Sequence, residues 1–105
     1  MGAVSFAHRI SGFLLFLAMP FGLYLMGLSL SSESGFNQTL AIVNSLPFQI
    51  VAFFLVWSLL HHLFAGIRYL LLDFDLGVDK ATARASAIAV IVCGLVFTLL
   101  SGLLL

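Results

Sequence analysis

Long runs without charge divide the chain into three apolar segments. No Asp, Glu, Lys or Arg occurs from Ile10 to Ser32, from Pro47 to Gly66, or from Ala85 to Leu105. At a rise of about 1.5 Å per residue, about 20 residues of helix cross the roughly 30 Å hydrocarbon core of a bilayer. The pattern therefore predicts three transmembrane helices. They cover about residues 6–30, 48–72 and 83–105.

These helices predict an all-α membrane protein with a single transmembrane domain over residues 1–105. Three spans bury little surface against one another, so we expect them to pack against other membrane helices. Pro20 lies near the middle of the first span, where we expect a kink. His8 and Arg9 ahead of an apolar run are also typical of a signal peptide. This run is longer than the usual apolar region of about 7–15 residues, and we interpret it as a span.

The two connections between the spans differ in charge. The first, Glu33 to Gln38, is polar and turn-prone, which predicts a loop. The second, from Asp73 to Arg84, is the most charged part of the chain and contains Gly77, which interrupts the apolar pattern. Basic residues precede the first span and surround the second connection, and none lies in the first. By the positive-inside rule, the N-terminus and the second connection face the cytoplasm.

The composition excludes a soluble domain. Of the 105 residues, 63% are hydrophobic and 8% are charged, whereas soluble domains have about 25% charged residues. The formal net charge is zero, and no run of like charges is available for a nucleic-acid backbone or for anionic lipid headgroups. Cys93 has no second thiol with which to form a disulfide or a metal cluster. We interpret it as a core or lipid-facing residue.

A pair of histidines lies inside the second span. His62 is about ten residues, or roughly 15 Å, from the helix end near Leu72, which places it close to the bilayer midplane. Ionisable side chains at this depth normally face the interior of a bundle and have a specific partner. At about 100° per residue, a stripe roughly 60° wide on this helix carries a distinctive set of side chains. They are His62, Gly66, Tyr69 and Asp73.

Two interpretations of His62 remain open, a neutral ring bonded to a neighbouring helix and an axial ligand of haem. Haem ligation needs a neutral imidazole nitrogen and a small residue that lets the macrocycle approach the backbone, and Gly66 lies one turn away. Zinc is disfavoured because His61 and His62 point about 100° apart on a regular helix. We therefore expect His61 to be a packing or interfacial residue. A second axial ligand would have to come from another chain.

The start of the first span carries a polar face. Ser5, His8, Arg9 and Gly12 are spaced so that they share one side of a helix. Arg9 alone is typical of an interfacial residue that only sets topology. A quinone, however, needs hydroxyl or cationic donors for its carbonyl oxygens beside an apolar slot, and this face offers both. His8 or Arg9 is also suited to bind haem propionates at the membrane edge.

Two motifs resemble those of a known family. The segment from Ser5 to Gly12, SFAHRISG, resembles the serine, His-Arg and Ser-Gly signature that opens the first span of succinate dehydrogenase cytochrome b subunits. The segment from His61 to Asp73, HHLFAGIRYLLLD, resembles the second-helix motif of that family. That motif is a histidine, three residues, Gly-Ile-Arg and an aspartate soon after. Together with three spans at matching spacing, the resemblance covers essentially the whole chain. Tyr69 stands where many members have a second histidine.

The resemblance implies a function and a site. The chain would be the membrane anchor of a succinate:quinone oxidoreductase (respiratory complex II), in the bacterial inner membrane rather than the mitochondrial one. His62 would be the axial ligand of haem b, and Ser5 and Arg9 would line the ubiquinone pocket. His8 and Arg9 would also bind the cofactor at its propionates, and Asp73 would accept a hydrogen bond or ion pair at the same edge.

The family also implies partners. A second membrane anchor would complete the helical bundle and supply the other haem histidine. An iron–sulfur subunit would deliver electrons from a flavoprotein that oxidises succinate. This chain would carry no catalytic residue for succinate oxidation. A fumarate reductase anchor uses the same chemistry in reverse, and these residues do not separate the two directions.

Two further functions explain less of the sequence. A small transporter subunit predicts an acidic residue inside a span, whereas Glu33, Asp73, Asp75 and Asp79 lie in connections or at helix ends. A non-redox membrane scaffold explains the hydrophobicity, but it does not explain two polar faces at one side of the membrane. We therefore favour electron transfer.

Overall fold

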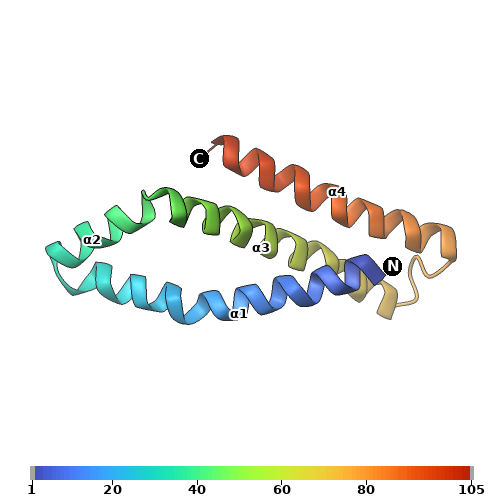
Figure 1. Cartoon of the computed structure of the whole chain (residues 1–105). Coiled ribbons are helices and arrows are strands. Elements are labelled where there is room, and N and C mark those ends of the chain that lie inside the picture. The colour runs from blue at the N-terminus through green and yellow to red at the C-terminus, as the bar shows by residue number, and fades with distance from the viewer. Residues whose placement is uncertain (1, 105) are drawn as a thin grey trace.

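The computed structural model describes residues 2–104, and these residues are almost entirely helical. The helices are α1 (Gly2–Ser31), α2 (Glu33–Val43), α3 (Leu46–Asp73) and α4 (Lys80–Leu104). Helix α3 lies between α1 and α4 in an elongated molecule of 56 × 25 × 17 Å (Figure 1). By length and composition, α1, α3 and α4 can each cross a membrane. The prediction of an all-α membrane protein with three spans is confirmed.

Capping side chains extend the spans slightly beyond their predicted limits. Ser45 precedes α3, and its Oγ accepts a hydrogen bond from the backbone N–H of Phe48 at 3.4 Å. The Asp79 carboxylate precedes α4 and accepts a bond from the backbone N–H of Thr82 at 3.1 Å. Such side chains satisfy the N–H groups that have no partner in the first turn of a helix, so the helix begins earlier than the apolar run. Leu105, the expected end of the third span, lies outside the described residues.

The prediction of a loop over residues 33–38 is wrong, because this stretch forms the first turns of α2. The Oγ of Ser32 accepts a hydrogen bond from the backbone N–H of Gly35 at 2.9 Å and caps the helix. Glu33 in the first turn interacts favourably with the helix dipole. Helix α2 then packs against the end of α1, where a Cβ on Gly35 would collide with the carbonyl oxygen of Leu28. The polar composition correctly located the connection between the first two spans, but local capping makes this connection helical.

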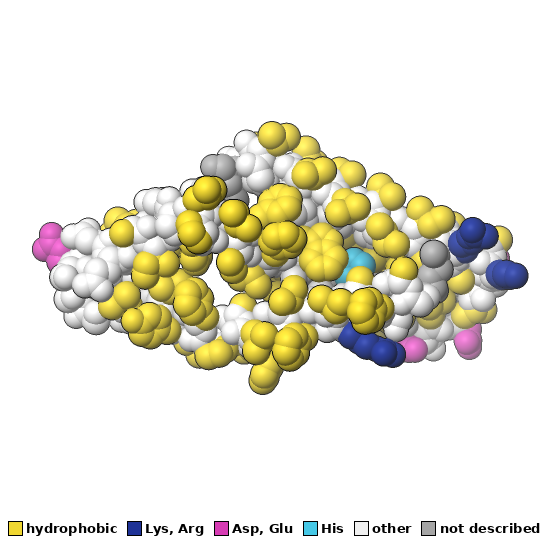
Figure 2. All heavy atoms as spheres, viewed as in Figure 1, with side chains coloured by type: hydrophobic (Ala, Val, Ile, Leu, Met, Phe, Trp, Pro, Cys, Tyr) yellow, Lys and Arg dark blue, Asp and Glu magenta, His cyan; other side chains and the backbone are white. Residues whose placement is uncertain are grey.

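Small and polar side chains form much of the contact between the spans, whereas most large hydrophobic side chains face outward (Figure 2). Lipid tails are as apolar as leucine, so membrane helices gain little by burying large apolar groups against one another. They associate instead through close packing of small residues and through hydrogen bonds. The buried residues of α1, α3 and α4 are Val4, Ser11, Leu25, Ser58, His61, Ala65, Arg68, Ala87, Val90, Gly94 and Thr98.

The start of α1 lies beside the turn that joins α3 to α4 (Figure 1). Lysine and arginine side chains gather at this end of the molecule (Figure 2). The predicted clustering of the two basic segments at one end is therefore confirmed. Helix α1 continues through Pro20 and bows along its length (Figure 1), and a sharp kink at this proline stays a prediction.

A tight turn after α3 begins the connection to α4. The backbone N–H of Asp75 donates to the carbonyl of Leu72, and that of Leu76 donates to the carbonyl of Leu71, both at 3.0 Å. This pair of bonds is the Schellman arrangement, which needs a left-handed residue just past the helix. Asp75 takes that conformation at φ 59°, and Gly77 follows at φ 69°. Gly77 interrupts the apolar pattern of the sequence, and Asp75 is the residue at which the chain leaves the helix.

Candidate functional site

The two adjacent histidines of α3 face different helices. The His62 ring stacks on the His8 ring of α1, with centroids 4.0 Å apart and an interplanar angle of 8°. His61 packs against Gly94 of α4 and stacks on Trp57, with centroids 5.2 Å apart. Only 2% of His61 is exposed, and its Nε2 has no hydrogen-bond partner within residues 2–104. The two rings point in different directions, as expected for adjacent residues of a helix. His61 is enclosed by protein, and His62 lies against the start of α1.

The Nδ1 edge of His62 is bound by α1. Nδ1 lies 3.1 Å from the Ser11 hydroxyl oxygen and 3.2 Å from the His8 carbonyl oxygen. The Ser11 hydroxyl in turn donates to the same His8 carbonyl at 2.8 Å. The other ring nitrogen, Nε2, has no hydrogen bond to any residue from 2 to 104. The ring is thus oriented through one nitrogen, and the second nitrogen is available to a ligand.

Two glycines shape the space around His62. A Cβ on Gly12 of α1 would lie 3.0 Å from Cε1 of the ring, so the absence of a side chain there lets α1 approach closely. A Cβ on Gly66, one turn along α3, would meet nothing within 4 Å. The small residue predicted to leave room for a flat macrocycle therefore borders open space, and the glycine that contacts the ring is Gly12.

Tyr69 extends this cluster toward the membrane edge. Its ring meets the His8 ring edge-on, with centroids 5.2 Å apart and an angle of 80°. Its hydroxyl oxygen is buried and has no hydrogen-bond partner in the described part of the chain. The predicted stripe of His62 and Tyr69 on one face of α3 thus lies against His8 of α1.

The other predicted site residues lie near this cluster in the chain, but within residues 2–104 no hydrogen bond or ion pair joins them to it. Arg9 is exposed and Ser5 is half-buried near the start of α1. Asp73 is exposed at the end of α3. Between residues 2 and 104, these three side chains form no hydrogen bond or ion pair, so their polar groups are available to a ligand or to another chain.

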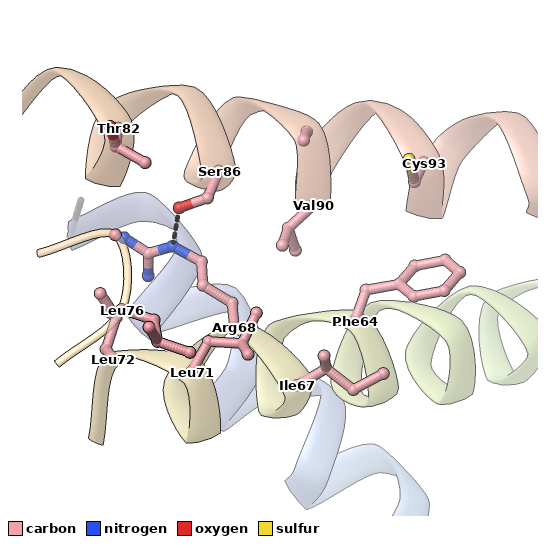
Figure 3. Close-up of a pocket in the computed structure, with 12 residues that line it drawn as sticks. Phe64, Ile67, Arg68, Leu71, Leu72, Leu76, Thr82, Ser86, Val90 and Cys93 are labelled. Carbon is pink, nitrogen blue, oxygen red and sulfur yellow. Dashed lines mark hydrogen bonds between the residues drawn. The ribbon is translucent and has the colours of Figure 1, made fainter. Parts of the chain in front are cut away.

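Arg68 lies on the opposite, α4-facing side of α3. Its side chain is 6% exposed, and it donates to the Ser86 hydroxyl at 3.0 Å (Figure 3). It also donates to the Ala83 carbonyl at 3.2 Å. A mostly apolar cavity of about 430 Å³ lies beside it between α3 and α4. In the sequence Arg68 was only one of the basic residues that set topology. The structure makes it the polar link between the two helices.

Ser11 is the residue of this site that the sequence interpretation did not single out. It lies inside the Ser-Gly pair of the first motif and three residues after His8, so a signal was present. Its contact with His62, 51 positions away, depends on how α1 packs on α3.

Comparison with known proteins assigns the family. A family model described as succinate dehydrogenase/fumarate reductase transmembrane subunit matches residues 1–101. The succinate dehydrogenase cytochrome b556 subunit of Coxiella burnetii (strain RSA 493 / Nine Mile phase I) is 34% identical over 103 residues. That match covers 97% of this chain and 82% of the relative. The chain therefore belongs to the family of succinate dehydrogenase/fumarate reductase transmembrane subunits.

Proposed function

We propose that this chain is the cytochrome b anchor of a succinate:quinone oxidoreductase, holding haem b and passing electrons from an iron–sulfur subunit to ubiquinone. The observation that carries the proposal is the environment of His62. Its ring is bonded through Nδ1 and stacked on one face, while Nε2 has no partner among residues 2–104. A histidine that ligates a metal typically has this arrangement, with one nitrogen fixed by a hydrogen bond and the other free.

The surroundings of His62 fit a haem. Open space beside Gly66 leaves room for a flat group next to α3. The enclosed His61 has no comparable space, because α4 packs against it. Haem b, when bound, supplies a one-electron redox centre. His8, Arg9 and Asp73 would be its polar partners at the membrane edge, and a histidine of a second anchor subunit would be its other protein ligand.

Ser5 and Arg9 are suited to bind the quinone. Reduction of a quinone places negative charge and then protons on its two carbonyl oxygens, so donors at those oxygens favour the reaction. The Ser5 hydroxyl and the Arg9 guanidinium have no hydrogen-bond or ion-pair partner among residues 2–104. Both residues belong to the start of α1, and lysine and arginine side chains gather at that end of the molecule (Figure 2). That end faces the cytoplasm of a bacterial inner membrane by the positive-inside rule. The iron–sulfur subunit therefore docks there, and the protons come from the same side.

The haem assignment is tested by the same substitution at both histidines of α3. His62→Leu and His61→Leu are expressed with the partner subunits, and the reduced-minus-oxidised spectrum of the membranes is recorded. We expect the b-type haem signal to be lost with His62→Leu and kept with His61→Leu. A full haem signal in the His62 variant would remove it as a ligand.

The quinone assignment is tested by separating two activities of the same complex. Ser5→Ala and Arg9→Leu should lower quinone reduction, because each removes a donor to the carbonyl oxygens. Succinate oxidation by an artificial acceptor should stay intact, since it bypasses this chain. An equal loss of both activities would indicate failed assembly, and unchanged quinone reduction would exclude these residues from the site.

A further inference from the structure

We infer that Ser11 is a positioning residue for His62. Its hydroxyl selects the imidazole tautomer that carries the proton on Nδ1 and keeps the lone pair of Nε2 for iron. This inference rests on the haem role proposed above for His62, and it assigns a task to a buried side chain that this proposal does not use.

The hydrogen bonds decide where the proton lies. The His8 carbonyl oxygen can only accept, and it is 3.2 Å from Nδ1. The Ser11 hydroxyl has one proton, which it donates to the same carbonyl at 2.8 Å, so its oxygen presents a lone pair to Nδ1 at 3.1 Å. Both groups that face Nδ1 are therefore acceptors. A neutral imidazole satisfies them only with the proton on Nδ1, which leaves Nε2 as the acceptor nitrogen.

The remaining contacts prevent the ring from leaving this position. Ser11 is fully buried at 0% exposure, so water does not compete for its hydroxyl. His8 covers one face of the ring at a centroid distance of 4.0 Å. Gly12 brings the α1 backbone against Cε1. A small rotation of the ring would lengthen both bonds to Nδ1, so the orientation and the tautomer are set together.

The chain also provides a matched control. Ser58 on α3 is likewise fully buried, and its hydroxyl donates to the Phe54 carbonyl of its own helix at 2.8 Å. Ser58 therefore shares with Ser11 the burial, the residue type and the bond to a local carbonyl. It lacks the bond to a histidine of another helix. A comparison of the two serines isolates that bond.

The hydrogen bond at Nδ1 of His62 also affects how strongly its Nε2 donates electron density to iron. An imidazole whose Nδ1–H donates to an acceptor gives more electron density through Nε2, which favours the oxidised iron. Losing the Ser11 acceptor leaves only the longer bond to the His8 carbonyl. The midpoint potential should then shift upward, and haem retention should fall by about tenfold or more, as when other outer partners of metal ligands are removed.

The test uses the whole complex with Ser11→Ala, Ser11→Thr and Ser58→Ala. Redox titration of the haem absorbance gives the midpoint potential, haem content after gel filtration gives retention, and succinate oxidation by an artificial acceptor reports assembly. We expect a positive shift and weaker retention for Ser11→Ala only. Ser11→Thr keeps the hydroxyl and should stay near wild type. For a one-electron couple, a tenfold change in the preference for oxidised iron corresponds to about 59 mV.

The outcomes separate this inference from the proposed function. If Ser11→Ala matches wild type in potential and retention while His62→Leu loses haem, the positioning role is wrong and the haem ligand stands. If Ser58→Ala shifts as much as Ser11→Ala, loss of any buried hydroxyl is sufficient and the role is again wrong. If the wild-type complex carries no haem, the proposed function fails and the role of Ser11 fails with it.

Discussion

Two glycines face the adjacent histidines of α3, and the same substitution at each is expected to have opposite effects. A Cβ on Gly94 would lie 3.7 Å from the His61 Cα, which is ordinary van der Waals contact. A Cβ on Gly12 would lie 3.0 Å from Cε1 of His62 and 3.5 Å from its Nδ1. The alanine therefore fits at Gly94, whereas at Gly12 it must displace the ring.

The magnitudes follow from two competing terms. Replacing glycine by alanine inside a helix stabilises by about 0.5–1 kcal/mol, because glycine loses more backbone freedom on folding. At Gly94 nothing opposes this gain. At Gly12 an overpacking cost of about 1–3 kcal/mol applies, since the His62 ring cannot yield without lengthening its bonds of 3.1 and 3.2 Å to α1. Gly12→Ala should therefore be less stable than Gly94→Ala by roughly 2 kcal/mol.

Both variants are purified in the same detergent and unfolded by denaturant, and the haem spectrum of each assembled complex is recorded. We expect Gly94→Ala to be at least as stable as wild type with an unchanged spectrum. Gly12→Ala should be destabilised and should lose or alter its haem signal. The reasoning is refuted if Gly12→Ala equals Gly94→Ala in both measurements, because the close approach of α1 to His62 would then be absent.

Substitutions at three further positions test the α1–α3 cluster and the turn between α3 and α4. Tyr69→Phe removes a buried hydroxyl that lacks a hydrogen-bond partner within residues 2–104. It should stabilise the haem-free chain against denaturant by about 1 kcal/mol or more. A loss of stability would mean that the hydroxyl is bonded. Asp75→Gly relieves the left-handed backbone at φ 59° and should stabilise by about 0.5–1 kcal/mol in the same assay, while Asp75→Val should destabilise. The backbone N–H and hydroxyl of Thr82 hold the pKa of Asp79 below its ordinary value of 3.8. The stabilisation that ionised Asp79 gives to the folded state is therefore complete above pH 3.8. It is lost as the pH falls through the lowered pKa. Asp79→Ala should lower the melting temperature at neutral pH, and its difference from wild type should shrink in acid; a constant difference would contradict the assignment.

The pattern of charge along the chain was sufficient to predict the spans. Uncharged apolar runs of this length favour a membrane-spanning helix, because a helix satisfies every backbone polar group internally in lipid. The basic end was equally predictable, since arginine and lysine are confined to the N-terminus, the end of α3 and the second connection. Helix α2 was not predicted, because one capping bond to Ser32 outweighs the turn propensity of a polar stretch.

The sequence by itself determined the number of spans, the basic end and the angular separation of His61 from His62. These properties depend on backbone hydrogen bonding and on the regular geometry of a single helix. Only the tertiary structure decided which neighbour each side chain meets. It buried Arg68 against α4, enclosed His61 and placed Ser11 on the Nδ1 edge of His62. The periodicity of one helix specifies a direction around its own axis, whereas these contacts depend on how separate helices pack together.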